Sequence, residues 1–228
     1  MSRPFVFINV AMSVDGKIDT FERHGASISS PADKARVDRL RAGSDAVAVG
    51  GHTLLEEDPK LTVKSGQLRA QRTAQGLSEN PMKVGVVTRA TIAPHSNFLE
   101  AGPANVAVFT TTQTTEEQID ALEARGARVF VLGQKRVDLS KVLETLRDLG
   151  VKRLMVEGGA TLNFELLRLG LVDEVMTYIA PFIFGGALAP TLAAGDGLVR
   201  SAAVALKLVE TEILDEDGGV VLHYALSK

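Results

Sequence analysis

Short apolar runs alternate along this chain with segments whose apolar positions recur every three or four residues. The runs are rich in Val and Ile and are bounded by Gly, Pro or Asp, which is typical of buried β-strands. The predicted strands are Phe5–Val10, Ala46–Val49, Val84–Val87, Val106–Phe109, Arg128–Val131, Leu154–Val156 and Val175–Ala180.

The intervening segments predict helices by their periodicity and by the residues at their ends. Ser30-Pro31 favours a helix start, because Ser is a good N-cap and Pro fits the first turn. The predicted helices are 32–41, Thr115–Arg125, Leu139–Leu149 and Leu162–Leu169, of which the last three end at glycine. Strands that alternate with helices predict an α/β fold with a largely parallel sheet. Leu206–Ile213 and Val220–Ala225 predict an antiparallel pair at one edge.

One stretch shows neither the apolar run of a strand nor the periodicity of a helix. Lys64–Lys83 is polar and contains Gly, Ser, Asn and Pro, so it is interpreted as a mobile surface loop rather than a linker. The chain shows no internal repeat and no low-complexity tract. We therefore predict one domain over residues 1–228.

Composition narrows the class of protein. The chain has 45% hydrophobic and 23% charged residues, and its net charge of −3 gives no electrostatic support for a nucleic acid or an anionic membrane as partner. No apolar run reaches the roughly 18 residues of a membrane span, and the N-terminus lacks a signal-peptide pattern, which predicts a cytoplasmic protein. Cysteine is absent, and the four histidines lack metal-ligand spacing, so no metal site is predicted.

Two glycine corners carry the candidate chemistry. Gly158-Gly159 follows a predicted strand and precedes a predicted helix, and Gly50-Gly51 stands in the same relation to Ala46–Val49. Glycine lets a bulky anion approach the backbone, and the N–H groups of a helix start favour that anion. Neither corner is a GxGxxG or P-loop motif, so either could be a tight connection without a ligand. Two such corners together favour a bound cofactor.

Single polar residues near these corners have two readings each. Glu157 could be a structural acid that accepts N–H bonds from its own turn, or an anchor for a polar ring or a ribose hydroxyl; its place beside the glycines favours the anchor. Asp15 is typical of a turn, whereas Lys17 could be solvated or could reach a phosphate. Arg41 could face solvent, as a lone arginine on a helix usually does, or could bind a substrate phosphate near the hydroxyls of Ser27–Ser30. No Ser-His-acid order supports a hydrolase.

Four segments in sequence order carry a resemblance: "AMSVDGKI", "ISSPADKARVDRLRAGSDAVAVGGHTLLEEDPKLTVK", "VEGGATLNFELLRLGLVDEV" and "YIAPFIFGGALAPTL". Together they resemble the pyrimidine reductases of riboflavin biosynthesis over nearly the whole chain. The resemblance implies a dihydrofolate-reductase-like fold, a three-layer α/β/α arrangement with a mixed, mostly parallel sheet, in a homodimer. It also implies NADPH as cofactor and a ribosylamino-pyrimidine 5′-phosphate as substrate, reduced to the ribitylamino compound.

The resemblance further implies roles for individual positions. The NADPH-contacting positions are Ala11, Ser27, Thr53, Glu57, Arg89 and the segment Gly159–Glu165, which includes Ala160, Thr161 and Leu162. The substrate-contacting positions are Gly25, Arg41, Leu61, Lys64 and Glu157. The chain departs from the family at three of these positions, since family members commonly have Asp for Glu57, often Trp for Ser27, and in bacteria Arg for Lys64.

These assignments give a mechanistic hypothesis. The Gly158-Gly159 corner with Thr161 would hold the cofactor's diphosphate, and Arg89 would meet its 2′-phosphate, which NADH lacks. The hydride would go to C1′ of the opened sugar. Glu157 would hold the substrate, and either Lys17 or water would deliver the proton.

The chain has no cysteine for the zinc deaminase domain of the bacterial two-domain relatives, and its segment "APFIFGGALAPTL" resembles the stand-alone archaeal and fungal reductases. Their substrate is 2,5-diamino-6-ribosylamino-4(3H)-pyrimidinone 5′-phosphate. The alternatives are the same reduction of 5-amino-6-(5-phosphoribosylamino)uracil, a dihydrofolate reductase activity, and a nucleotide-binding module without turnover.

Overall fold

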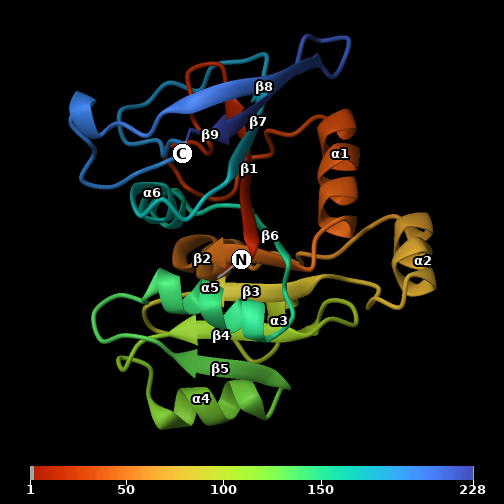
Figure 1. Ribbon diagram of the computed structural model, residues 1–228, viewed down its shortest axis with the longest axis vertical. Coiled ribbons are helices and arrows are strands. Elements are labelled where there is room, and N and C mark those ends of the chain that lie inside the picture. The colour runs from red at the N-terminus through yellow and green to blue at the C-terminus, as the bar shows by residue number, and fades with distance from the viewer. Residues whose placement is uncertain (1–2, 228) are drawn as a thin grey trace. The chain divides into compact units, whose positions relative to one another are not determined.

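The computed structural model describes residues 3–227, which form two compact units (Figure 1). Unit 1 consists mainly of Asp38–Met155, and unit 2 combines Phe5–Val37 with the chain from Val156 onward. Unit 2 is built from two separate stretches of the chain. The two units therefore do not correspond to two consecutive parts of the sequence. A single domain over residues 1–228 stays a prediction.

Unit 1 is built on parallel strands, and the side chains of its central strands are almost all buried. Val47 pairs with Lys83, and Val84 pairs with Ala107, in evenly spaced parallel ladders. Burial on both faces explains why these strands read as continuous apolar runs rather than as alternating ones. The strand order is β5-β4-β3-β2-β6, with bounds β2 (Ala46–Gly50), β3 (Met82–Val86), β4 (Val106–Thr110), β5 (Ala127–Val131) and β6 (Arg153–Val156).

The α-helices of unit 1 in the described part of the chain begin at side-chain caps. Thr115 and Gln118 form a reciprocal capping box at the start of α4, which packs beside β5 (Figure 1). Asp138 accepts the N–H groups of Ser140 and Lys141 at the start of α5. The bounds are α2 (Gly66–Ala74), α3 (Asn97–Glu100), α4 (Glu116–Glu123) and α5 (Leu139–Asp148).

The interpretation of Lys64–Lys83 as a loop is wrong, because α2 lies within it. Ser65 caps this helix by accepting the N–H of Leu68. The helix is fastened by a charged residue: the Arg72 guanidinium is buried and donates to the carbonyls of Ala42, Ser44 and Ser78 at 2.7–2.8 Å. In α2 a buried arginine attaches the helix to the rest of unit 1, a role that a stripe of apolar side chains normally has. The pattern of hydrophobic residues therefore did not indicate a helix here.

Lys83 is a second buried cation that the sequence did not reveal. Its side chain is fully buried, and Nζ donates to the carbonyls of Asn97, Phe98 and Ala101 at 2.5–3.3 Å. Burial lowers the pKa of Lys83 to about 8, although the nearby Asp58 carboxylate opposes that shift. The ammonium thus donates to carbonyls at the end of the short helix α3, where unpaired carbonyls remain, although the Asn97 carbonyl also accepts the Ala101 N–H at 2.9 Å.

Unit 2 combines parallel and antiparallel pairing. Strand β1 pairs with β7 in parallel, whereas β7 with β9 and β9 with β8 are antiparallel, which confirms the predicted terminal pair. Helix α6 (Ala160–Arg168) belongs to this unit, as do the residues of α1 (Pro31–Ala42) up to Val37. The strand order is β1-β7-β9-β8, with bounds β1 (Phe5–Ser13), β7 (Glu174–Ala180), β8 (Leu206–Ile213) and β9 (Val220–Leu226).

Within residues 3–227, no helix has both the length and the apolar character needed to cross a membrane.

Candidate functional site

The corner between β6 and α6 has the open backbone that the glycines predict. Gly158 has φ +112° and Gly159 has φ +41°, a region that residues with a Cβ rarely adopt. The main chain of Gly158 is buried, yet a Cβ built there would meet no atom within 4 Å outside its immediate neighbours. Packing therefore does not require glycine at this position, and the space beside its main chain is open.

Helix α6 also begins without a side-chain cap. Its N-cap residue is Gly159, which has no side chain to accept the first N–H groups, and Thr161 in the first turn is exposed. Helices α2, α3, α4 and α5 are all capped by a Ser, Thr or Asp side chain. The start of α6 thus lacks the side-chain cap that these four helix starts possess. This geometry fits an external anion such as a diphosphate.

Glu157 stands directly before these glycines and is half-buried. The strand residues Leu154, Met155 and Val156 that precede it are at most 1% exposed. The buried strand therefore fixes the position at which the carboxylate leaves the sheet.

The second glycine corner differs from the first. A Cβ on Gly51 would lie 3.3 Å from the Val87 side chain, so close packing accounts for this glycine. The following helix, of the π type, covers only Thr53–Glu57. Thr53 is half-buried and Glu57 is exposed at the two ends of this turn. A tight connection between strand and helix, without a bound ligand, therefore explains the glycine at position 51.

The turn after β1 in unit 2 carries Lys17. The ammonium of Lys17 donates to the Ala189 carbonyl at 3.3 Å, and the Asp15 carboxylate accepts from Ser13 Oγ at 2.6 Å and from the Gly185 N–H at 2.8 Å. The Ser13 hydroxyl, with help from backbone N–H groups, lowers the pKa of Asp15. Asp15 thus acts as an anchor between two loops, in keeping with its interpretation as a turn residue.

Asp19 holds the loop that contains Gly25, and sequence reasoning missed it. Its buried carboxylate accepts the N–H groups of Thr20, Gly25 and Ala26 at 2.7–3.0 Å. Burial raises the pKa of Asp19, but the three N–H bonds and His24 outweigh burial, so that the net pKa is lowered. An isolated Asp six residues before a glycine carries no recognisable sequence signal.

A buried polar network attaches the start of α1 to β1. Asp33 is fully buried and accepts from Ser29 Oγ at 2.5 Å and from Arg36 Nε at 2.8 Å. Arg36 Nη2 continues the network to Asn9 Oδ1 at 2.8 Å. These bonds fix the position of the Ser27–Ser30 segment, in which Ser27 itself is exposed.

Arg89 lies on a turn that a threonine cluster shapes. Thr111 Oγ1 donates to the Thr88 carbonyl at 2.7 Å, and the Ala90 N–H donates to Thr114 Oγ1 at 3.0 Å. Both threonines are buried, whereas Arg89 between these anchor points is exposed. The repeated Thr residues of the sequence therefore have a structural role that composition did not indicate.

The remaining predicted residues of unit 1 gather at the segment before α2. Arg41 Nη1 donates to the Thr62 carbonyl at 3.0 Å, and the Lys64 side chain is exposed. Leu61 has φ +50° and its side chain is buried, so only its main chain could meet a ligand. Among residues 3–227, no group of three or more His, Cys, Asp or Glu side chains could hold a metal ion.

The predicted site residues thus divide between the two units. Unit 2 holds Ala11, Lys17, Gly25, Ser27 and Glu157–Leu162, and unit 1 holds Arg41, Thr53, Glu57, Leu61, Lys64 and Arg89.

Residues 4–220 match the family described as the RibD C-terminal domain. The chain belongs to this family. It is 42% identical over 198 residues to the 2,5-diamino-6-ribosylamino-4(3H)-pyrimidinone 5′-phosphate reductase of Archaeoglobus fulgidus, covering 87% of this chain and 90% of the relative. It is 41% identical to the protein of the same name from Methanothermobacter thermautotrophicus, covering 98% of this chain and 99% of the relative. The predicted resemblance is confirmed.

Solved structures confirm the predicted fold of this RibD C-terminal domain. Acinetobacter baumannii RibD aligns with a TM-score of 0.81 and 26% identity over 100% of this chain but 59% of the other, so this chain spans little more than half of that protein. A dihydrofolate reductase from Enterococcus faecalis aligns with a TM-score of 0.53 and 13% identity, covering 98% of this chain and 97% of the other, which shows a common fold. The dihydrofolate-reductase-like α/β fold, with its mixed and mostly parallel strands, is therefore established.

Proposed function

We propose that this chain is an oxidoreductase that reduces 2,5-diamino-6-ribosylamino-4(3H)-pyrimidinone 5′-phosphate to the ribitylamino compound in riboflavin biosynthesis, with NADPH as the reductant. The names of two archaeal relatives at 41–42% identity support the substrate and the reaction. The observation that carries the proposal is the open Gly158-Gly159 corner, where helix α6 begins without a side-chain cap beside Glu157.

This corner fits the diphosphate of a dinucleotide. Its N–H groups and the Thr161 hydroxyl would donate to diphosphate oxygens, while Ala160 and Leu162 continue the first turn. NADPH, when bound, supplies the hydride for C1′ of the opened sugar. Arg89, exposed on its threonine-anchored turn, would meet the 2′-phosphate. The other proposed cofactor contacts are Ala11, Ser27, Thr53 and Glu57.

The proposed substrate contacts include two cations of unit 1 and Glu157 of unit 2. Arg41 and Lys64 would bind the substrate phosphate, which an arginine and a lysine recognise by charge-assisted hydrogen bonds. Gly25 and the main chain of Leu61 would border the pyrimidine. Glu157, fixed by its buried strand, would hold the ring.

Lys17 is the proposed proton donor. Its ammonium already donates one hydrogen bond to the Ala189 carbonyl, which holds the side chain in place and leaves two protons on the nitrogen for other acceptors. The alternative donor is water.

We further propose that the protein is a cytoplasmic homodimer. All residues of β8 are exposed, and Leu206, Leu208, Val209 and Ile213 are 43–78% exposed although they are apolar. An exposed apolar strand at the end of a sheet is a site for pairing with another chain. A second copy of this chain would cover it.

The reaction is tested by following NADPH oxidation with the diamino-pyrimidinone phosphate, the amino-uracil phosphate and dihydrofolate as separate substrates. We expect the highest kcat/KM for the diamino compound. A higher value for the amino-uracil phosphate would instead assign the deaminated substrate. Brisk oxidation with dihydrofolate would indicate a dihydrofolate reductase, and NADPH binding without turnover of any substrate would indicate a binding module.

A further inference from the structure

The segment Val63–Ser65 of unit 1 is held by side chains along both edges of its main chain. On one edge, the two carboxylate oxygens of Asp38 accept the N–H groups of Lys64 at 2.6 Å and of Ser65 at 2.8 Å. On the other edge, Nη1 of Arg69 donates to the carbonyls of Val63 at 2.9 Å and of Lys64 at 2.8 Å. Asp38 and Arg69 therefore clamp the peptide groups on both sides of Lys64.

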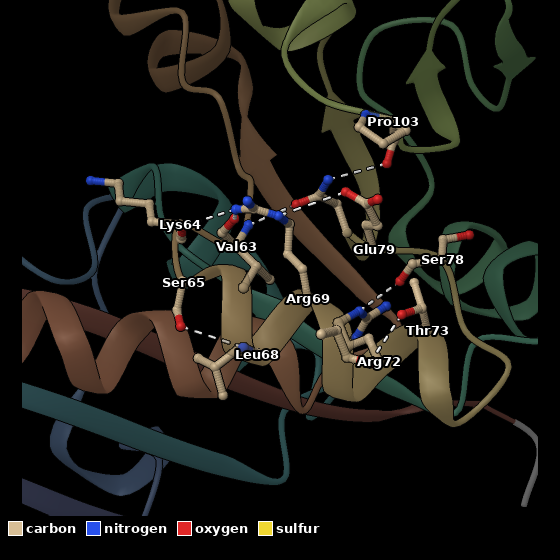
Figure 2. A network of polar contacts seen from close by, with 12 residues as sticks. Val63, Lys64, Ser65, Leu68, Arg69, Arg72, Thr73, Ser78, Glu79 and Pro103 are labelled. Carbon is tan, nitrogen blue, oxygen red and sulfur yellow. Dashed lines mark hydrogen bonds and ion pairs between the residues drawn. The ribbon is translucent and has the colours of Figure 1, made fainter.

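Figure 2 shows the side of this clamp that the Arg69 guanidinium forms. Glu79 lies on the far side of Arg69, with its Oε2 at 3.6 Å from Nε. The Lys64 side chain extends away from the guanidinium, and only main-chain atoms of Lys64 enter the clamp (Figure 2). The clamp thus fixes the backbone from which an exposed ammonium projects.

Neighbouring bonds reinforce the same segment. The Val63 N–H donates to Oδ1 of the buried Asn80 at 2.8 Å, and the Thr62 carbonyl accepts from Arg41. The preceding Leu61 is held at φ +50°, a conformation that persists only where the surroundings determine it. Val63–Ser65 belongs to no helix or strand, so these side chains supply the hydrogen bonds that regular structure supplies elsewhere.

A loop needs such rigidity when it must present a group accurately. Binding groups act best when the shell around them prevents their displacement, and a shift of about 1 Å can cost roughly a hundredfold in rate. We propose that Asp38 and Arg69 are positioning residues that hold Val63–Ser65 so that the Lys64 ammonium is fixed for the substrate phosphate. This inference rests on the proposed function of Lys64.

The proposal is tested by a double-mutant cycle between Arg69→Met and Lys64→Ala. If Arg69 acts through Lys64, Arg69→Met alone raises the KM for the pyrimidine phosphate roughly tenfold or more, whereas in the Lys64→Ala protein it raises KM by less than about twofold. The Kd for NADPH, measured by fluorescence, stays within about twofold of wild type in each variant. Multiplicative effects of the two substitutions would overturn the proposal.

Controls separate positioning from general damage. Arg125→Met removes another partly exposed arginine of unit 1, which contacts the Glu100 and His95 side chains, and we expect no change in KM. Arg69→Lys retains a positively charged donor but not the planar guanidinium, and it should give an intermediate KM. It replaces Arg69→Met in the cycle if that variant does not fold. Asp38→Asn should speed hydrogen exchange at the Lys64 and Ser65 amides, and unchanged exchange there would also refute the clamp.

The outcomes also distinguish this proposal from the function on which it rests. A wild-type protein that leaves the pyrimidine unreduced overturns the proposed function and the positioning role together. An active wild-type protein in which Arg69→Met leaves KM unchanged overturns the positioning role alone.

Discussion

Replacing Gly158 with alanine separates the cost of backbone strain from the loss of a ligand site. The φ of Gly158 is +112°, so Gly158→Ala should lower the free energy of unfolding by about 1–3 kcal/mol through strain alone. No steric clash adds to this cost, because the new Cβ would meet no atom within 4 Å. That methyl group would, however, occupy the space through which a diphosphate approaches the amides. Losing one charge-assisted hydrogen bond of about 1.5–3 kcal/mol should raise the Kd for NADPH about ten- to a hundredfold.

Gly150→Ala is the matched control. Gly150 has φ +89° after helix α5, and a Cβ there would also meet no atom within 4 Å. We expect both variants to lose similar unfolding free energy in urea denaturation, whereas only Gly158→Ala loses affinity in a fluorescence titration with NADPH.

Two results would refute the proposed role of Gly158. If Gly158→Ala showed the expected loss of stability but bound NADPH as the wild-type protein does, the corner would not hold the diphosphate. Equal losses of affinity in both variants would mean that strain, rather than the site, governs binding.

Three further predictions follow from named contacts. Because burial lowers the folded-state pKa of Lys83 from 10.5 to about 8, the unfolded chain binds more protons between these pH values, and wild-type stability should rise by about 3 kcal/mol across this window. Denaturation at several pH values should show no such rise in Lys83→Met. The lowered pKa of Asp19 gives stability that is present above its unfolded-state value of 3.8 and is lost as the pH falls through the folded value, so Asp19→Asn should melt at a temperature less sensitive to acid than wild type. Glu157→Ala should lower kcat/KM for the pyrimidine at least about tenfold while NADPH titrations stay unchanged; a collapse of NADPH affinity would contradict the assigned role.

Only part of the site could be predicted from the sequence. The Gly158-Gly159 corner was predictable, because paired glycines between a buried strand and a helix are a local pattern that indicates an open backbone. Asp19, Asp38 and Arg69 were not, since each acts on main-chain groups several or many residues away. The type of a polar residue does not indicate which distant carbonyl or amide it will hydrogen-bond in the folded chain.

The sequence by itself determined the strands and most helices of this protein, because these depend on local signals. Thr115 and Asp138 cap their helices within three residues, and β2 and β4 are apolar runs that are buried on both faces. Tertiary structure alone decided where buried charge stabilises the fold. Arg72 and Lys83 appear as surface residues in a one-dimensional pattern, yet each is buried among carbonyls contributed by segments remote in sequence. A charged group can be buried only where such partners converge, and that convergence exists only in the folded chain.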